Sequence, residues 1–352
     1  SEKKGGAMKA LVYHGPGKRQ WEDVPNPTIQ APTDAIIRIT TTTICGTDLH
    51  ILQGHVPAVE AGRILGHEGV GVVEEVGDAV ENIKVGDKVL ISAITSDGRC
   101  DRCKVSMYSH CRNGGWVLGH LINGTQAEYV RIPHADTSTY KLPADADEEA
   151  MVMLSDIFPT RVEDGVINGK VRPGDTVLIV GAGPIGLATL ITAQLYGPAE
   201  LWMVDLDKNR LDVAKKWGAT KTFDASDSDL AKKIMELTKG DGVDVAVEAV
   251  GIPATWDLCQ KIVAPGGHIA NVGVHGKPVE FELDKLWIRN ITVRTGLVDT
   301  STIPILMRML QSGKLNAKQM VTHRFQLQEA MKAYDTFQNA AQEKAIKVVL
   351  RA

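Results

Sequence analysis

From Thr176 onward, the chain alternates short apolar runs with longer segments of helical spacing. The expected strands are Val177–Val180, Leu201–Val204, Val243–Val247 and His268–Val272. The expected helices cover 184–196, 208–217, 228–239 and 254–263. Because parallel strands need a crossover connection, this alternation predicts a parallel sheet with helices on its faces.

A glycine-rich turn, Gly181-Ala182-Gly183-Pro184-Ile185-Gly186, separates the first of these strands from its helix. The pattern G-x-G-x-x-G indicates a dinucleotide site when a strand precedes it and a helix follows. Gly181 would allow the tight turn, Gly183 the approach of a pyrophosphate, and Gly186 close packing of helix on strand. The helix start would offer free N–H groups to the phosphates. A glycine turn without a ligand is the alternative.

An acidic residue, Asp205, ends the next expected strand. A carboxylate at this point accepts hydrogen bonds from the ribose hydroxyls and repels a 2′-phosphate, so it favours NAD over NADP. A solvated strand end is the alternative for this residue. Arg210 follows five residues later and either reaches the ribose or is solvated.

The chain before residue 157 has a different sequence pattern. Short runs such as Ala35–Thr40, Val70–Val76 and Lys88–Ser92 are separated by Gly, Pro and Asp turns, which predicts a β-rich domain. The tail contains a helix-like segment, 302–312, and a last strand, 346–350. A chain of 352 residues is long enough for two domains. We expect one domain from 1–156 and 296–352, and another from 157–295.

Two segments of this β-rich part carry residues that can bind metal. In Gly66-His67-Glu68-Gly69, two polar side chains stand at the start of an apolar strand, where burial without a partner would be costly. The upstream segment Cys45-Gly46-Thr47-Asp48-Leu49-His50 carries a thiol, a hydroxyl and an imidazole. Cysteine and histidine with an open position are usual ligands of a catalytic zinc. The alternative is that Cys45 and His67 are unrelated core residues.

Three of the five cysteines lie close together in sequence, at Cys100, Cys103 and Cys111. In a reducing compartment, such a cluster more often binds metal than forms disulfides. Cys259 lies in an apolar helical pattern and is expected to be a core residue.

Together these motifs resemble the zinc-dependent medium-chain alcohol dehydrogenases, including their formaldehyde-dehydrogenase-like branch, over the chain from Met8 onward. The resemblance implies an α/β protein with a GroES-like β-rich catalytic domain and a Rossmann domain with a doubly wound parallel sheet. It implies a catalytic zinc held by Cys45, His67 and a third residue at the domain junction, where Asp156 stands. Glu68 matches a carboxylate that tunes the zinc and in some members coordinates it. A helix cap is the alternative role for Asp156.

The resemblance also implies roles around the substrate and cofactor. Thr47 would bond the alcohol oxygen, and His50 would release the proton at the surface, as suits a side chain with a near-neutral pKa. Thr160 matches a threonine against the nicotinamide, with a helix cap as alternative. Lys347 matches a basic residue that meets the pyrophosphate, with a solvated lysine as alternative. Trp116 is expected to wall the substrate pocket.

The cysteine cluster departs from the family pattern. The family's structural zinc lobe has the spacing C-x₂-C-x₂-C-x₇-C, and here Asp97 takes the first place before Cys100, Cys103 and Cys111. A carboxylate can ligate zinc, so the resemblance implies a second, structural zinc on this set. Such a site would hold zinc more weakly than four thiolates and lose it more easily at low pH. His110 is the fallback ligand.

The expected activity is that of an NAD-dependent zinc alcohol dehydrogenase, which interconverts small primary or secondary alcohols with aldehydes or ketones. Formaldehyde, polyol and threonine dehydrogenases share these motifs. A zinc-free quinone reductase and a non-catalytic cofactor sensor are further alternatives. The metal ligands argue against a zinc-free reductase, and the pair Thr47 and His50 argues against a non-catalytic sensor. Arg161 and Glu163 either pair with each other or border the substrate channel.

Composition restricts the partners and the location. The net charge of −4 gives no reason to expect nucleic acid or a membrane surface. No apolar run approaches the roughly 20 residues of a membrane helix. Residues 1–7 read as an extension without the apolar core of a signal peptide, so we expect the cytoplasm. The resemblance implies a homo-oligomer, a tetramer more readily than a dimer.

Overall fold

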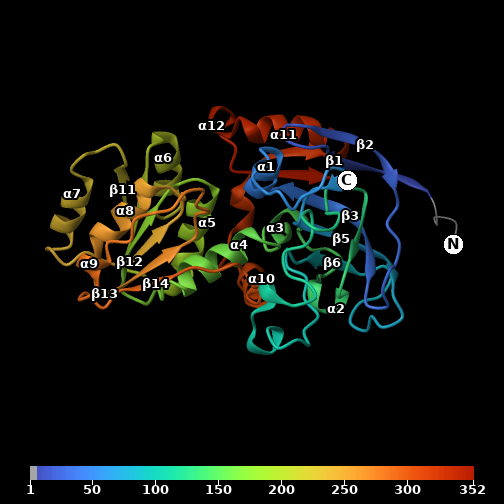
Figure 1. Cartoon of the computed structure of the whole chain (residues 1–352), viewed down its shortest axis with the longest axis horizontal. Coiled ribbons are helices and arrows are strands. Elements are labelled where there is room, and N and C mark those ends of the chain that lie inside the picture. Colours follow the sequence, from blue (N-terminus) through green and yellow to red (C-terminus); the bar gives the residue numbers. More distant parts are fainter. Residues whose placement is uncertain (1–5) are drawn as a thin grey trace. The chain divides into compact units, whose positions relative to one another are not determined.

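The computed structural model describes residues 6–352, which divide into two compact units (Figure 1). The first unit comprises the chain up to Asp156 together with Asp299–Leu310 and Asn316–Ala352. The second unit comprises Ile157–Val298 and Gln311–Leu315. The expected extension at 1–7 lies mostly outside the described residues.

The first unit is built on two sheets that are almost entirely antiparallel. The smaller sheet has the order β2 (Arg19–Pro25), β1 (Ala7–Tyr13), β4 (Arg63–Ile64). The larger sheet has the order β15 (Val321–Gln326), β16 (Lys347–Arg351), β3 (Ala35–Ile44), β5 (Gly69–Val76), β6 (Lys88–Ile91), β8 (Thr139–Lys141), and β7 (Tyr129–Ile132) pairs with β3. Only β15 and β16 run parallel among these pairs.

Helices connect these strands, and one of them covers the last strands. Helix α11 (Ala330–Gln338) packs against β2, β15 and β16, and its Tyr334 is fully buried beside Ile44 and Leu350. The helices are α1 (Gly46–Leu52), α2 (Ala135–Ser138), α3 (Glu148–Val152), α10 (Ile303–Gln311), α11 (Ala330–Gln338) and α12 (Ala340–Glu343). Single helical turns cover Cys103–Val105, Tyr108–His110, Ala317–Met320 and Leu327–Glu329.

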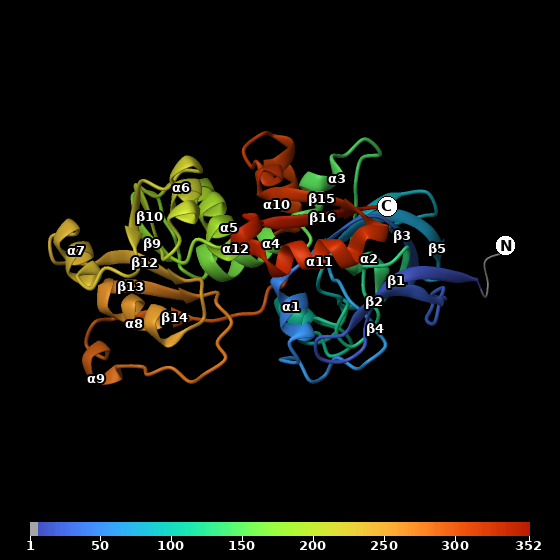
Figure 2. The same ribbon diagram turned by 90° about the horizontal axis from the view of Figure 1, so that it is seen from above.

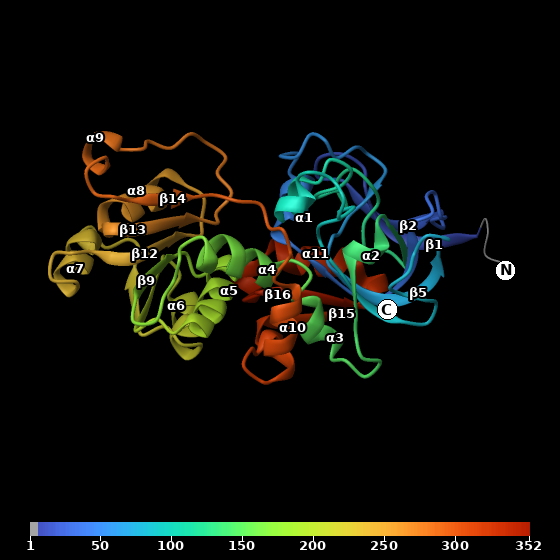
Figure 3. The same ribbon diagram turned by 90° about the horizontal axis from the view of Figure 1, so that it is seen from below.

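The second unit is a parallel sheet with helices on both faces. Its order is β11 (Lys221–Asp224), β10 (Glu200–Asp205), β9 (Thr176–Val180), β12 (Val243–Glu248), β13 (Val263–Asn271), β14 (Thr292–Arg294). Helices α5 (Pro184–Ala193) and α6 (Lys208–Lys216) lie on one face, and α8 (Pro253–Ile262) lies on the other (Figures 2 and 3). The strand order reverses at β9, which is where α/β sheets of this kind bind ligands. The remaining helical segments are α4 (Ile157–Thr160), a π-helical stretch (Arg161–Ile167), a turn at Gln194–Tyr196, α7 (Leu230–Leu237) and α9 (Leu283–Leu286).

The fold class predicted from the alternating pattern is confirmed, with three local differences. Strands β11 and β14 were not expected, because Lys221-Thr222-Phe223-Asp224 is short and half polar and Thr292-Val293-Arg294 has only three residues. Strand β13 begins at Val263, where a helix was expected to continue to 263 and the strand to start only at His268. Pro265 disfavours helical geometry in the residue before it, so the apolar pair Val263-Ala264 joins the sheet instead.

A membrane-spanning helix would need a long apolar stretch, and none of the helices within residues 6–352 has one.

Candidate active site and metal centres

Four side chains with metal-binding atoms converge in the first unit. Cys45 follows β3 and precedes α1, and His67 and Glu68 directly precede β5. Asp156 is the last residue before α4. His67 Nε2 lies 2.9 Å from Asp156 Oδ2, and Cys45 Sγ lies 4.0 Å from the same oxygen. With a carboxylate oxygen of Glu68, these atoms all lie within 4.8 Å of one another.

The donor set fits a zinc ion. A thiol, an imidazole and a carboxylate are the ligand types that zinc takes at catalytic sites. The second oxygen of Glu68, Oε2, is buried and has no hydrogen-bond partner within the described part of the chain. A buried carboxylate oxygen without a partner is costly unless a cation lies nearby. Cys45, His67 and Asp156 would therefore hold the ion, with Glu68 within reach.

Burial and charge act in opposite directions on the imidazole. His67 is 4% exposed, and burial alone would lower its pKa. Hydrogen bonds to Asp156 and Cys45, together with their charges, outweigh burial and raise the pKa of His67 well above its ordinary value. A metal ion bound to these donors would compete with a proton for the imidazole.

A chain of buried hydrogen bonds fixes the backbone at Cys45. Asp48 Oδ2 accepts the Cys45 N–H at 2.9 Å and the Gln126 Nε2–H at 3.0 Å. The Tyr334 hydroxyl donates to Gln126 Oε1 at 2.6 Å. Burial raises the pKa of Asp48. No role was predicted for Asp48, Gln126 or Tyr334 from the sequence, although Cys-x-x-Asp at a helix start is a capping signal that points to Asp48.

Strand β16 places a lysine next to the donor set of Cys45, His67, Glu68 and Asp156. Lys347 Nζ lies 2.8 Å from Glu68 Oε1, and Lys347 is 2% exposed. Burial alone would lower the pKa of Lys347, but the charges of Glu68 and Cys45 outweigh the effect of burial and raise this pKa. The alternative of a solvated lysine is therefore wrong. Contact of Lys347 with a pyrophosphate stays a prediction.

The expected substrate-side residues differ in how close they lie to these ligands. Thr47 Oγ1 lies 3.7 Å from Cys45 Sγ. The ring of Trp116 meets the His67 ring edge-on, with 6.4 Å between centroids, and stacks on His120 at 4.0 Å. His50 is exposed on α1, 5.8 Å from the His55 ring. Partial burial and the charge of His55 lower the pKa of His50.

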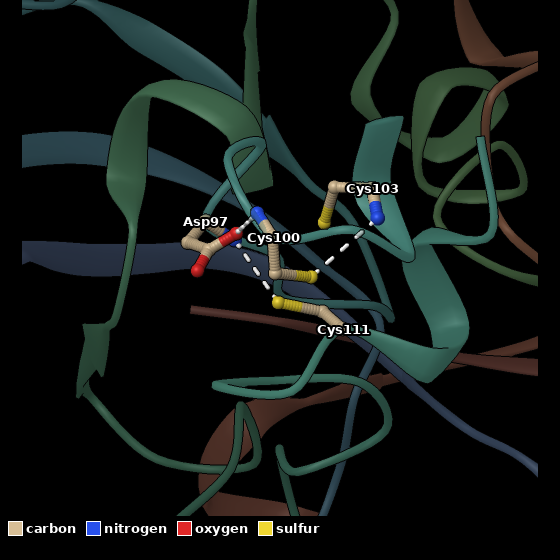
Figure 4. A group of neighbouring side chains, drawn as sticks. All are labelled: Asp97, Cys100, Cys103 and Cys111. Atoms are coloured by element: carbon tan, nitrogen blue, oxygen red, sulfur yellow. Dashed lines mark hydrogen bonds between the residues drawn. The ribbon is translucent and has the colours of Figure 1, made fainter. Parts of the chain in front are cut away.

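The second predicted cluster is also assembled. Donor atoms of Asp97, Cys100, Cys103 and Cys111 lie within 4.8 Å of one another, and the three sulfur atoms face a common space (Figure 4). His110 is not part of this group. Three thiols and a carboxylate fit a structural zinc site in which one thiolate is replaced.

Local hydrogen bonds favour the anionic forms of Asp97 and Cys100, whereas burial opposes ionisation of Cys103 and Cys111. The Arg99 and Cys100 N–H groups donate to Asp97 Oδ1 at 2.8 and 3.1 Å, and Asn113 Nδ2 donates to Oδ2 at 2.8 Å. These bonds hold the pKa of Asp97 well below its usual range. Backbone N–H groups of Arg112 and Cys103 lower the pKa of Cys100 to about 7, whereas burial raises the pKa of Cys103 to about 12.

In the second unit, the glycine turn has the geometry that the motif requires. Gly181 has φ +114°, which favours glycine. A Cβ atom on Gly186 would lie 1.7 Å from the Gly181 carbonyl oxygen, so no side chain fits there. Gly183 precedes Pro184, the first residue of α5, and leaves the N–H groups of the first turn, including that of Ile185, for a ligand.

The carboxylate of Asp205 is fixed beside this turn. Its Oδ2 accepts the Ala182 N–H and its Oδ1 accepts the Asp207 N–H, each at 2.7 Å. Arg210 approaches the same turn, because its Nη1 would lie 3.7 Å from a Cβ atom on Gly183. Thr160 is the last residue of α4 and lies partly buried in the second unit.

Comparisons with known proteins agree with both units. Residues 31–144 match the model of the alcohol dehydrogenase GroES-like domain, and 184–312 match the zinc-binding dehydrogenase model. An alcohol dehydrogenase of Cupriavidus necator is 34% identical over 94% of this chain and 95% of its own. The apo form of zinc-dependent alcohol dehydrogenase 2 from Streptococcus pneumoniae has a TM-score of 0.93 and 55% identity, covering 98% of each chain. Alcohol dehydrogenase TADH from Thermus sp. ATN1 has a TM-score of 0.91 and 34% identity, covering 98% of this chain and 99% of its own. The chain therefore belongs to the zinc-dependent medium-chain alcohol dehydrogenase family.

Proposed function

We propose that this protein is an NAD-dependent zinc alcohol dehydrogenase that interconverts small primary or secondary alcohols with aldehydes or ketones. The observation that carries the proposal is the convergence of Cys45, His67 and Asp156 next to Thr47. A zinc-free reductase of the same fold would have no use for such a buried donor set. The glycine turn with Asp205 supplies the features of a dinucleotide site in the second unit.

The residues around the donor set suit removal of a proton from an alcohol. Cys45, His67 and Asp156 would hold a zinc ion there, which would supply the Lewis-acid chemistry that lowers the pKa of a substrate hydroxyl. Thr47 Oγ1 would accept the hydroxyl proton and release its own proton toward His50. His50, exposed on α1, delivers a proton to water, and its lowered pKa keeps the imidazole neutral and able to accept.

NAD is the proposed cofactor because of Asp205. Its carboxylate is oriented by two backbone N–H groups, and an anion held in place repels a 2′-phosphate. Arg210 lies near the turn and would attract the same phosphate. We propose that the fixed carboxylate decides the preference, because the Arg210 side chain is also within 4.0 Å of Asp207.

The position of Trp116 supports the proposal that the substrates are small. Its ring stacks on His120 and approaches His67, so a rigid aromatic wall stands beside the donor set. Formaldehyde, polyols and threonine remain candidate substrates of the same class.

The second donor set is proposed to hold a structural zinc through Asp97 and the three cysteines. A reducing compartment keeps such thiols free to bind metal, so we also propose a cytoplasmic location.

We also propose that the protein forms a homo-oligomer, and a tetramer rather than a dimer. β14 is the edge strand of its sheet, and Trp287 and Ile288 before it are 69% and 67% exposed. Leu283 and Phe281 add to this apolar surface. An exposed edge next to large apolar side chains favours pairing with another chain.

One experiment on freshly purified protein tests the activity. Metal content is measured together with NADH and NADPH production from primary alcohols, secondary alcohols, formaldehyde, polyols and threonine. We expect turnover of small alcohols with NAD, loss of turnover in Cys45→Ser, and a folded variant by circular dichroism. Full activity after removal of all metal by a chelator would contradict the proposal.

A further inference from the structure

The carboxyl edge of the parallel sheet offers two regions to a dinucleotide. The glycine turn follows β9, and Asp205 ends β10 on one side of it. On the other side, β12 ends at Glu248 and β13 ends at Asn271. A dinucleotide lies across the point where strand order reverses. Because Asp205 is proposed to bind the adenosine half, the nicotinamide half would lie over the ends of β12 and β13.

A buried carboxylate joins the two loops at these strand ends. Glu248 is 0% exposed. Its Oε1 accepts the Val250 and Gly251 N–H groups at 2.7 and 2.8 Å, and the Thr255 hydroxyl at 3.0 Å. These three bonds lie within the loop that follows β12 and the start of α8.

The other oxygen of the same carboxylate binds the neighbouring loop. Glu248 Oε2 lies 2.8 Å from His275 Nε2, and this nitrogen is also 2.7 Å from Asn271 Oδ1. The backbone oxygen of Glu248 accepts the Val272 and Gly273 N–H groups at 2.9 and 3.0 Å. A buried carboxylate is costly without a donor or cation, and His275 supplies one. We call this pair the Glu248–His275 clamp.

The two loops approach so closely that no side chain fits between them. Gly251 has φ +91°, and a Cβ atom there would lie 2.2 Å from the Val274 carbonyl oxygen. A Cβ atom on Gly273 would lie 2.5 Å from the Gly251 nitrogen and 2.6 Å from Glu248 Oε2. On the outside of this contact, Val250 and Val274 are 42% and 72% exposed. Two apolar side chains are thus held in solvent at the strand ends by a buried polar pair.

We propose that the Glu248–His275 clamp positions loops 249–252 and 272–275 to receive the nicotinamide end of the dinucleotide. Glu248 and His275 act as positioning residues, and the surfaces they fix are the exposed side chains and backbone of the two loops. The inference rests on the proposed use of a nicotinamide dinucleotide. No other part of the proposed mechanism needs a histidine at this position.

The test compares two ligands that share the adenosine half. NADH carries the nicotinamide, whereas ADP-ribose ends before it. Dissociation constants of both are measured by calorimetry for the wild-type protein, His275→Ala and Glu248→Gln. We expect NADH to bind about tenfold more weakly to the variants, as for one lost hydrogen bond, with ADP-ribose binding unchanged. His275→Gln, whose amide can donate to Glu248, is expected to restore part of the NADH affinity.

Controls separate positioning from a general loss of structure. His268→Ala changes a histidine within β13, the strand that precedes the loop of His275, and is expected to leave both affinities unchanged. Equal weakening of NADH and ADP-ribose in His275→Ala and Glu248→Gln would overturn the positioning role, and so would unchanged NADH binding. Failure of the wild-type protein to bind NADH or NADPH would overturn the proposed function as well.

Discussion

Lys347 Nζ lies 2.8 Å from Glu68 Oε1, and the two side chains are 3% and 1% exposed. Strand pairing explains how residues so distant in sequence meet. β16 pairs antiparallel with β3, and Val348 stands opposite Ile44, so Lys347 comes next to Cys45. The last strand of the chain therefore closes the donor set with a buried positive charge.

Removal of this charge is expected to destabilise the fold. In Lys347→Met, the buried carboxyl group of Glu68 loses its partner, which costs about 3–5 kcal/mol. The free energy of unfolding is measured by urea denaturation. The matched control is Lys332→Met, an exposed lysine of α11, with an expected change within about 0.5 kcal/mol. Equal stability of both variants would show that the ion pair contributes nothing.

The Asp97 cluster predicts two metal ions per chain. Asp97→Ala leaves three thiols, so we expect the second zinc to be lost first during dialysis against a chelator. Asp97→Cys completes a four-thiolate set and is expected to retain zinc to lower pH, because thiolates suit zinc better than a carboxylate. Zinc is counted by elemental analysis at each pH. One zinc per chain in freshly purified wild-type protein would rule out the second site.

Asp205 is expected to decide between the two nicotinamide cofactors. Asp205→Ala removes the acceptor of the ribose hydroxyls and the charge that repels a 2′-phosphate, so the KM for NAD should rise about tenfold. The KM for NADP should fall at the same time. Because the carboxylate also accepts two backbone N–H groups, Asp205→Asn serves as the control that keeps one oxygen. An unchanged ratio of kcat/KM for NAD and NADP would assign the preference to other residues.

The pair His50 and His55 predicts a shift in the pH profile. Burial and the charge of His55 lower the pKa of His50, so the neutral, proton-accepting form persists to lower pH. In His55→Ala the charge is removed and the pKa of His50 rises. The acid limb of kcat/KM for alcohol oxidation should therefore move to higher pH. A profile that does not move would exclude His50 as the group that accepts the proton.

Trp116 is expected to limit substrate size. Trp116→Ala removes a large ring next to His67, so branched secondary alcohols should gain in kcat/KM relative to ethanol. The relative change should reach about tenfold, as expected for filling apolar space. His120→Ala, which leaves Trp116 in place without its stacking partner, is the comparison. An unchanged ranking of alcohols would place the substrate away from this ring.

Local patterns were sufficient for much of the fold. The alternation after Thr176 predicted the parallel sheet, because strand and helix periodicity are properties of neighbouring residues. The turn from Gly181 to Gly186 could be interpreted for the same reason, since each glycine answers a local steric demand. Strand β11 escaped detection because its four residues carry no clear periodicity.

The donor sets depended on a different kind of information. Cys45, His67, Asp156 and the Asp97 cluster were proposed from spacing and resemblance, and the structure brings each set together. Cysteine, histidine and aspartate are costly to bury without a partner, so their presence next to apolar strands pointed to a metal site from the sequence alone.

The sequence by itself determined the elements, the glycine turn and the candidate ligands. The tertiary structure alone decided which side chains pair with the buried carboxylates. Lys347 pairs with Glu68, His275 pairs with Glu248, and Gln126, which is bonded to Tyr334, pairs with Asp48. These contacts depend on which strands lie side by side and in which register. Strand register is fixed by packing over the whole unit, so it cannot be predicted from a local sequence pattern.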